Sequence, residues 1–332
     1  MPKHYSRHMR SGAGWQTIRS GGVEGLKFAD GRETICVASP HLARASRDRS
    51  SPSRGGWVLP VGFPSSPHSA KPRAMNRTGL FIALALWLVI GLVFGLYPEL
   101  DLKLASLFFD PQTKTFPLKL NGWASFARDA AMWVAWAFAL PSLVALVVKM
   151  VRPDRPLMVS GRAIIFLLVT LTMSAGILTN LTFKSYWGRP RPVVVTQFAG
   201  DQQFVPWWDP RGGCARNCSF FSGEGATAFW TLAPAALAPP AWRPLAYAGA
   251  VIFGAVTSGL RMAFGGHFFT DVAIAGLVSF VVIWFAYALI YRWPRTRFSD
   301  AAVDAALTRL TWPAYQLRQR LFGRKTGPEP SI

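Results

Sequence analysis

The chain has 332 residues, of which 51% are hydrophobic and only 16% are charged. This composition is too apolar for an ordinary soluble domain and is typical of a membrane protein with several transmembrane helices. The formal net charge of +20 would also suit a nucleic-acid-binding protein. The basic residues cluster between apolar segments, however, as topological signals do, so we expect no nucleic-acid partner.

Residues 1–74 differ in kind from the rest of the chain. They are rich in Arg, Ser, Gly and Pro, show neither helical nor strand periodicity, and lack the apolar core of a secretory signal. We expect either a disordered basic extension or a mis-assigned start. The second reading is open because Met75 opens MNRTGLFIALALW, an ordinary beginning for a membrane protein.

Residues 75–292 are predicted to be an all-α, polytopic membrane domain with six transmembrane helices. Each uncharged stretch is about long enough for a helix to cross ~30 Å of hydrocarbon. The fourth and fifth are short and rich in Ala, Gly and Pro, so we expect them to pack inside the bundle. The six stretches are Gly79–Tyr97, Ala130–Val148, Ala163–Phe183, Gly225–Trp242, Pro244–Leu260 and Val272–Tyr291.

The basic residues between these stretches predict the orientation. On a six-helix path they fall on one side, which we interpret as cytoplasmic, with both termini inside. Residues 293–332 are then a basic, partly amphipathic cytoplasmic tail at the membrane surface. The residues concerned are Lys149, Arg152, Arg155, Arg162, Arg243, Arg292, Arg295 and Arg297.

Three loops face outward in this topology. The first, Pro98–Gly122, balances three acids with three lysines and is interpreted as a solvated loop or interfacial helix. The second opens KSYWGRPRPVVV and carries Lys184, Arg189 and Arg191 on the side that the positive-inside rule leaves poor in basic residues. Such a cluster is either a set of snorkelling side chains or an anion site, because guanidinium and ammonium groups bind phosphate oxygens.

The same loop holds Cys214 and Cys218 on the oxidising side, so a small disulfide is possible. Zinc would need two further ligands, and none is nearby. The loop ends in Ser222-Gly223-Glu224, where the apolar run begins. Ser is a good helix N-cap and Glu224 is an ordinary first-turn acid, so these residues alone indicate only a helix start.

The third outward stretch reads GLRMAFGGHFFTDVAIAG. Arg261 ends one apolar segment, and His267 and Asp271 are four residues apart, hence on one helical face. A carboxylate can hydrogen-bond one imidazole nitrogen while the other points outward, which is the arrangement of an oriented nucleophile. We therefore favour a catalytic His267 over an interfacial histidine.

These residues form an ordered pattern: Lys184 with Arg191-Pro192 after six intervening residues, then Ser222-Gly223, then Arg261, His267 and Asp271. The pattern resembles the type 2 phosphatidic acid phosphatase (PAP2) superfamily of membrane lipid phosphatases, which is related to acid phosphatases and vanadium haloperoxidases. The resemblance covers about residues 79–292. The Trp-rich second loop and the Ser-Gly-Glu sequence look like the bacterial lipid A phosphatase branch.

The resemblance implies a metal-independent hydrolysis without cofactors. His267 would attack phosphorus and form a phosphohistidine, while Asp271 would hold its tautomer and stabilise the imidazolium. The phosphoryl oxygens would be bound by Lys184, Arg191, Ser222, Gly223 and Arg261. The sequence offers no obvious carboxylate cluster for a metal.

Two positions depart from the family pattern. The family usually has His where this chain has Glu224, and Ser where it has Leu260. The resemblance implies that Glu224 takes the position of the acid that protonates the leaving group. Desolvation and a phosphate dianion favour its protonated form, whereas neighbouring Arg and Lys oppose it.

The expected partner is a phosphorylated lipid, bound from the bilayer on the outer face of a bacterial inner membrane, with the active site facing the periplasm. Lipid A is favoured, while undecaprenyl pyrophosphate, phosphatidylglycerophosphate and phosphatidic acid stay open. Two other functions stay open as well: a non-hydrolytic phospholipid-binding or transport protein, and a lipid phosphotransferase that uses the same histidine. The sequence does not indicate an oligomeric state.

Overall fold

The computed structural model describes residues 15–20, 23–28, 34–37, 77–292 and 299–322. The chain divides into two units, Met1–Pro67 and His68–Ile332. The first unit contains an antiparallel sheet in the order β1-β2-β3, formed by Trp15–Ser20, Val23–Phe28 and Thr34–Val37. The sequence pattern predicted no strand here, so that expectation is wrong for these three segments; the remaining residues of 1–74 lie outside the described part of the chain.

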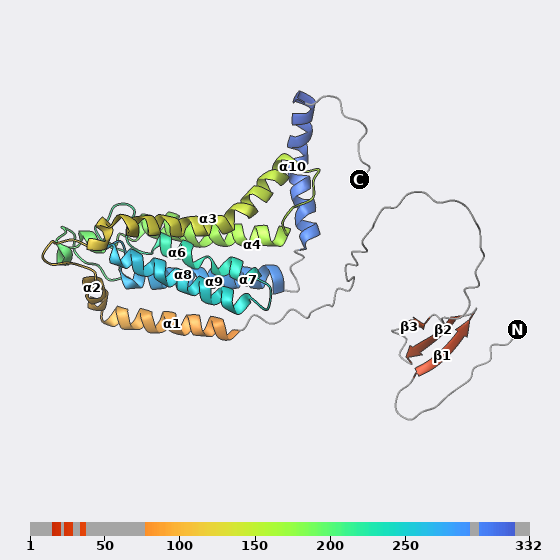
Figure 1. The fold of residues 1–332 in the computed structure, drawn as a ribbon, viewed down its shortest axis with the longest axis horizontal. Helices are drawn as coiled ribbons and strands as arrows, with labels where there is room; N and C mark the ends of the chain where they lie inside the picture. Colours follow the sequence, from red (N-terminus) through yellow and green to blue (C-terminus); the bar gives the residue numbers. More distant parts are fainter. Residues whose placement is uncertain (1–14, 21–22, 29–33, 38–76, 293–298, 323–332) are drawn as a thin grey trace, which may run out of the picture. The chain divides into compact units, whose positions relative to one another are not determined.

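The second unit is helical, as predicted: none of its described residues forms a β-strand. Most of its long helices run side by side in a bundle, while the last one stands across the end of the bundle (Figure 1). The longer elements are α1 (Arg77–Leu96), α3 (Gly122–Val151), α4 (Gly161–Leu171), α8 (Arg243–Ala263), α9 (Phe269–Tyr287) and α10 (Asp300–Phe322); the short helices are α2 (Glu99–Ser106), α5 (Lys184–Tyr186), α6 (Gly223–Phe229) and α7 (Leu232–Leu237). A π-helical stretch, Thr172–Phe183, joins α4 to α5, and another, Ala288–Arg292, extends α9. Three 3₁₀ turns complete the elements: Pro117–Leu120, Pro192–Val194 and Thr196–Phe198.

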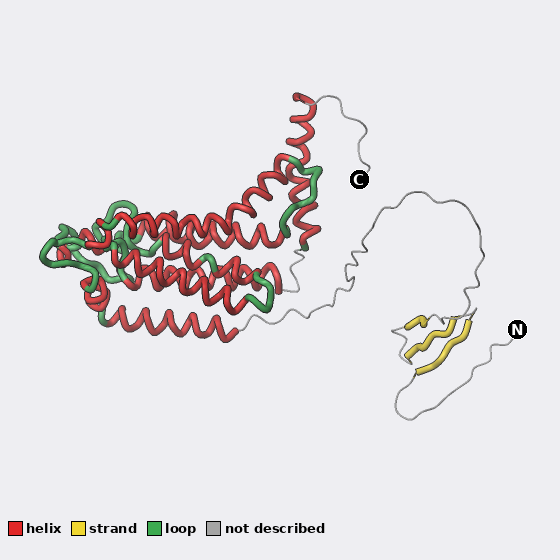
Figure 2. Tube along the Cα trace, viewed as in Figure 1, coloured by secondary structure: helices red, strands yellow, loops and turns green. Residues whose placement is uncertain are grey.

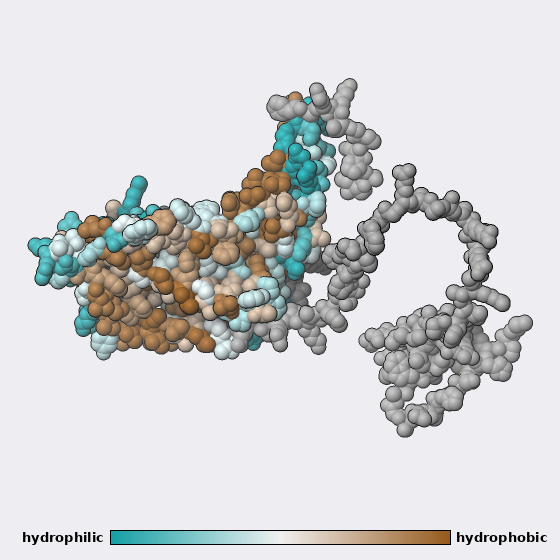
Figure 3. Space-filling view, in the orientation of Figure 1, coloured by the Kyte–Doolittle hydropathy of each residue, from teal (hydrophilic) through white to brown (hydrophobic). Residues whose placement is uncertain are grey.

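Among the described residues, five helices are long and apolar enough to cross a membrane: Arg77–Leu96, Gly122–Val151, Gly161–Tyr186, Arg243–Ala263 and Phe269–Arg292. Their outer surface is largely hydrophobic (Figure 3). These helices correspond to five of the six predicted spans, so the predicted count of six is not confirmed.

The predicted span Gly225–Trp242 is broken into α6 and α7. A regular helix would have residue 234 donate to the Trp230 carbonyl, but Pro234 has no N–H. The Ala233 N–H takes that carbonyl instead, at 2.8 Å, in a tight turn. The sequence therefore explains why this segment is two short helices rather than one long one.

The broken segment packs in the interior, as expected, because its residues are small and its neighbours carry glycines. Phe229 at the end of α6 lies between Gly254 of α8 and Gly276 of α9; a Cβ atom at Gly254 would lie 2.4 Å from the Phe229 ring. The fifth predicted span was also expected inside, but α8 exposes Leu245, Ile252 and Val256 on one face. This part of the prediction was wrong: Ala250 and Gly254 are buried, but Ala248 and Ala255 of the same helix are exposed together with the large apolar side chains.

Long loops gather at one end of the bundle (Figure 2), which we call the loop end; it comprises residues 97–121, 187–222 and 264–268. Helix α10 lies at the opposite end, within the predicted basic tail, and packs against α3 and α4. The buried Lys149 ammonium of α3 pairs with Asp304 of α10 at 2.9 Å, and Asp300 pairs with Arg162 of α4 at 3.4 Å. Arg295 and Arg297 of the predicted tail lie outside the described residues.

Candidate active site

The residues predicted to form the site come together at the loop end. Lys184 begins α5, Ser222 caps α6, Arg261 lies in the last turn of α8, and Asp271 lies in the first turn of α9. Backbone hydrogen bonds join the segments: the Ser222 N–H donates to the Asp271 carbonyl at 3.2 Å, and the Val193 N–H donates to the Gly265 carbonyl at 3.0 Å. The three sequence motifs, spread over 88 positions, are therefore neighbours in space.

His267 is buried between α8 and α9. Its Nδ1 lies 2.8 Å from the Ser219 backbone carbonyl. A carbonyl only accepts hydrogen bonds, so Nδ1 carries the proton and Nε2 keeps its lone pair. Burial lowers the pKa of His267 to about 4, although Asp271 opposes this shift. The imidazole is therefore neutral, in the tautomer that an Nε2 nucleophile needs.

Asp271 lies near the imidazole but does not accept its proton directly, because its Oδ2 is 3.8 Å from Nδ1. The expectation that Asp271 itself holds the tautomer is corrected by this geometry: the Ser219 carbonyl does so. Asp271 instead accepts hydrogen bonds from the Ser219 hydroxyl at 2.5 Å and the Phe268 N–H at 2.8 Å. It thus fixes the residue that orients His267 and places negative charge beside the ring.

A cavity of about 300 Å³ with several cationic walls lies beside these residues. Predicted anion ligands Arg191 and Arg261 line it, together with Gly266, which directly precedes His267. Sequence reasoning missed Lys119, in the turn before α3, and Arg128, in α3 itself, which line the same cavity. Four basic side chains around one cavity make it suited to a phosphate group.

Glu224 pairs with two of the cations. Its Oε2 lies 3.2 Å from Arg261 Nε and 3.6 Å from Arg128 Nε. The carboxylate is thus oriented by α8 and α3 at once, and it lies beside the cationic cavity. Neither of these contacts has hydrogen-bond geometry, since Glu224 Oε2, Arg261 Nε and Arg128 Nε are all buried without a hydrogen-bond partner.

Lys184 and Arg191 are held in different ways. A Cβ atom at Gly223 would lie 3.2 Å from Lys184 Nζ, so glycine lets the ammonium approach the start of α6. Arg191 donates twice to the Asn217 carbonyl, at 2.9 and 3.1 Å, and once to its side-chain oxygen at 2.7 Å. Burial lowers the pKa of Arg191, while Glu224 and Asp271 oppose this shift.

A second cavity, of about 600 Å³, extends from Lys184 past Asn217 to Arg216.

Arg189 does not join this cationic group. Its side chain is fully buried and binds Asp271 at 2.5 Å and Asp101 of α2 at 2.8 Å. The first outward loop was interpreted as a solvated loop or an interfacial helix; it does contain helix α2, but Asp101 of this helix is buried rather than solvated. The contact between Arg189 and Asp101 crosses 88 positions, so no local pattern could have shown it.

Two further observations concern ligands and covalent structure. Cys214 and Cys218 form a disulfide just before Ser219. Within the described residues, no group of three or more His, Cys, Asp or Glu side chains is placed to hold a metal ion. That the reaction needs neither metal nor cofactor stays a prediction.

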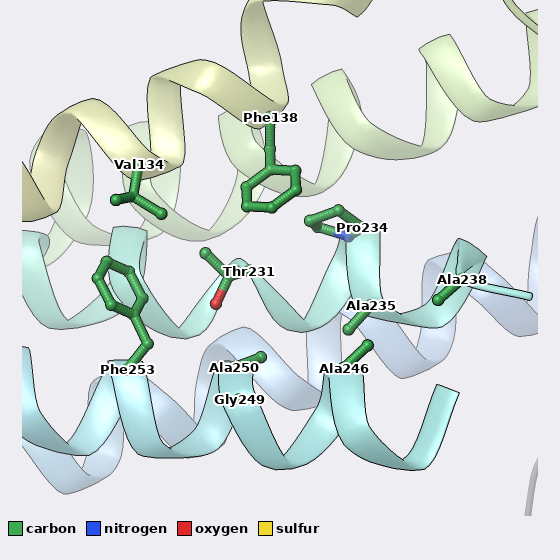
Figure 4. Close-up of a pocket in the computed structure, with 10 residues that line it drawn as sticks. All are labelled: Val134, Phe138, Thr231, Pro234, Ala235, Ala238, Ala246, Gly249, Ala250 and Phe253. Carbon is green, nitrogen blue, oxygen red and sulfur yellow. The ribbon is translucent and has the colours of Figure 1, made fainter. Parts of the chain in front are cut away.

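The other well-formed pocket has a different chemistry. It has a volume of about 400 Å³ and lies between α3, α7 and α8 (Figure 4). Its walls carry apolar side chains such as Val134, Phe138 and Phe253, with Thr231 as the polar exception. Because no charged side chain lines it, it offers nothing for a phosphate, and the cationic cavity is the better candidate site.

Comparison with known proteins identifies the family of the chain. The model of the PAP2 superfamily matches residues 163–295. The chain is 32% identical to a lipid A 4'-phosphatase of Francisella tularensis subsp. novicida over 219 residues, which are 66% of this chain and 98% of the relative. It is 30% identical to a lipid A 4'-phosphatase of Rhizobium leguminosarum over 59% of this chain and 90% of the relative.

A third protein of the same name, from Rhizobium etli, is 29% identical over 63% of this chain and 87% of the relative. No solved structure matches the chain.

Proposed function

Because this chain belongs to the PAP2 superfamily and is a membrane lipid phosphatase, we propose that it hydrolyses a phosphate ester of a lipid A-type lipid through a phosphohistidine at His267. One observation carries the proposal. The Ser219 carbonyl holds the Nδ1 proton of His267, which leaves the lone pair on Nε2, and Gly266, the residue before His267, lines the cavity together with Arg191 and Arg261.

In the first step, Nε2 of His267 forms a bond to phosphorus while the bond to the lipid oxygen breaks. Lys184, Arg191 and Arg261 bind the phosphoryl oxygens, helped by Ser222 and Gly223 at the start of α6. A Cβ atom at Gly223 would lie 3.2 Å from Lys184 Nζ, so this ammonium lies next to the helix start. These groups act by charge stabilisation, which is the main protein contribution to phosphoryl transfer. Glu224, in its protonated form, gives its proton to the departing lipid alkoxide.

In the second step, water attacks the phosphohistidine. Glu224, now a carboxylate, accepts the proton of that water. The P–N bond breaks, inorganic phosphate leaves, and His267 regains its neutral form. Asp271 stabilises the positive imidazolium that exists between the two steps, since it lies 3.8 Å from Nδ1.

The names of the relatives and the position of the site support a lipid A-type substrate. Three relatives are named lipid A 4'-phosphatases, and the cationic cavity lies at the loop end, where a helix bundle meets lipid headgroups. Lys149, Arg152, Arg155 and Arg162 lie at the opposite end. The positive-inside rule supports a periplasmic loop end in a bacterial inner membrane, with both termini cytoplasmic. Labelling of single cysteines at residues 120 and 155 with a membrane-impermeant maleimide tests this orientation: only residue 120 reacts from outside.

Phosphate release from lipid A by the full-length protein in detergent tests the function. We expect His267→Ala to abolish release while the protein stays folded. Release that is unchanged in His267→Ala contradicts the mechanism. Tight lipid binding without turnover in the wild type supports a binding or transport protein instead. Appearance of the phosphate on a second lipid rather than in water supports a phosphotransferase.

A further inference from the structure

A buried ionic network lies behind the candidate nucleophile. Arg189 Nη1 binds Asp271 Oδ1 at 2.5 Å and Arg189 Nη2 binds Asp101 Oδ2 at 2.8 Å. All three side chains are at most 1% exposed. Such a network is costly to desolvate and is weak evidence for stability. We therefore looked for a functional role of this network.

Both acids of the network are ionised, as their hydrogen bonds show. Asp101 accepts from Arg189, from the Thr270 N–H at 3.0 Å and from the Thr270 hydroxyl at 2.6 Å. Asp271 accepts from Arg189, from the Ser219 hydroxyl and from the Phe268 N–H. Arg189 and the backbone N–H groups can only donate, and each hydroxyl is able to donate as well, so these partners match the acceptor pattern of an ionised carboxylate. Burial raises the pKa of Asp101, and Arg189 opposes this shift by holding the charged form.

The surroundings keep water away from the network. The Arg189 guanidinium lies over the Phe268 ring at 4.5 Å and near the Phe204 ring at 5.7 Å. The phenyl ring of Phe204 in turn packs edge-on against Phe268. In such a site charges interact far more strongly than in water, so the sum of the buried charges matters.

The charges of the buried network do not cancel in the resting state. Asp101 and Asp271 contribute two negative charges and Arg189 one positive charge, whereas neutral His267 contributes none. The network thus has one negative charge in excess. When Nε2 of His267 bonds to phosphorus, the imidazole becomes an imidazolium and brings the missing positive charge.

We propose that Asp101 and Arg189 are positioning residues that tune the site for the phosphorylated, cationic form of His267, which makes helix α2 part of the catalytic machinery. Asp101 fixes Thr270 through two hydrogen bonds, and Thr270 lies between His267 and Asp271 in sequence. Arg189 fixes the Asp271 carboxylate, whose other oxygen holds Ser219. Each residue thus acts on His267 through a chain of direct contacts.

This inference rests on the proposed function, and a matched pair of variants tests it. Asp101→Asn removes one buried negative charge from α2, and Glu99→Gln removes one exposed negative charge from the same helix. With lipid A as substrate, we expect Asp101→Asn to lower kcat by about 10- to 100-fold and to leave KM within about 2-fold. Glu99→Gln is expected to behave like the wild type.

Two further readouts separate positioning from a loss of folding. The Kd for inorganic phosphate is expected to stay unchanged in Asp101→Asn, because the cationic cavity is intact. The pH at which ¹⁵N-labelled His267 titrates is expected to fall, because the imidazolium has lost a negative neighbour. The charged groups that face His267 from the neighbouring segments are Asp271, Arg191 and Arg261, and the variant changes none of them. A folded Asp101→Asn with the kcat of Glu99→Gln overturns the inference.

Arg189→Lys covers the case in which Asp101→Asn fails to fold. It keeps the charge but lacks the planar fork that joins two carboxylates. We expect a similar loss of kcat, and unchanged kcat in the folded variant overturns the inference. His267→Ala in the same assay separates the two proposals: if it is inactive while both network variants are normal, only the inference fails, and if it is active, the proposed function fails.

Discussion

At the scale of single residues, Glu224 is the site residue that departs from the family pattern. It pairs with Arg261 and Arg128 at the edge of the cationic cavity, so it could act as the acid or merely align Arg261. The two roles predict a different dependence of the reaction rate on the leaving group. A lipid alkoxide needs a proton as it departs, whereas an aryl phosphate releases a stable phenolate without one.

We therefore predict that Glu224→Gln lowers kcat/KM for lipid A by about 10²- to 10⁴-fold and for a soluble aryl phosphate by much less. Steady-state kinetics with the two substrates measure this difference. Glu224→His is expected to retain activity, because histidine can carry the same proton. Equal losses for both substrates in Glu224→Gln would show that the residue only aligns Arg261.

His267 gives a second prediction at this scale, from its pKa of about 4. The folded protein keeps the imidazole neutral down to that pH, while an ordinary histidine takes up a proton near 6.5. Stability from this residue is thus fully present above pH 6.5 and is lost as the pH falls toward 4. A ¹⁵N NMR titration of the substrate-free protein is expected to show the Nδ1–H tautomer at pH 6. A midpoint near 6.5 would contradict the burial of His267 against Ser219.

The residue scale also shows how far sequence reasoning reached. Spacing grouped Lys184, Arg191, Arg261, His267 and Asp271, and the structure brings their segments together. It missed Asp101, Ser219 and Arg128 because their partners lie far away in sequence. It also left Arg189 in a cluster interpreted as snorkelling side chains or an anion site, since a basic cluster does not reveal which side chain turns inward toward buried acids.

At the scale of elements, α6 sets the position of Ser222, Gly223 and Glu224. Its other end is fixed by Phe229, which fits between Gly254 and Gly276. A Cβ atom at Gly254 would lie 2.4 Å from the ring, and one at Gly276 would lie 2.8 Å from it, so the ring has no room to turn aside. Packing that is far from the cavity thus controls the geometry of the site.

Gly254→Ala is accordingly predicted to destabilise the protein by roughly 1–3 kcal/mol through overpacking and to lower kcat. Gly259→Ala is the matched control on the same helix, because no atom lies within 4 Å of its added Cβ. Thermal unfolding in detergent and lipid A turnover report the two effects. Adding Phe229→Leu is expected to restore stability to Gly254→Ala. Equal behaviour of the two alanine variants would contradict this packing.

Element boundaries were predictable where composition alone decides them. Five apolar stretches became long helices. The sixth stretch is interrupted at Pro234. A hydropathy profile did not predict this break, because it does not register a missing N–H. The exposed face of α8 was missed for a related reason: the mean hydropathy of a helix does not reveal which of its faces is buried.

At the scale of the whole molecule, charge is divided between the two ends of the bundle. The loop end carries the cationic cavity and the acids buried behind it, whereas the opposite end carries Lys149 and Arg162, which pair with α10. The predicted topology depended on this division, and the relatives support the membrane phosphatase function that it serves. The three strands between residues 15 and 37 were not predicted, because their sequences lack a clear alternation of apolar and polar residues.

The central claim is that His267 carries the phosphoryl group, and covalent trapping tests it most directly. Wild-type protein and Glu224→Gln would be mixed with a ³²P-labelled aryl phosphate, denatured in base, and digested for mass spectrometry. We predict an acid-labile, base-stable label on His267, with more label in Glu224→Gln because water attack is slowed, and none in His267→Ala. A folded, active enzyme whose label is on another residue, or that carries no label under rapid quenching, would contradict the account.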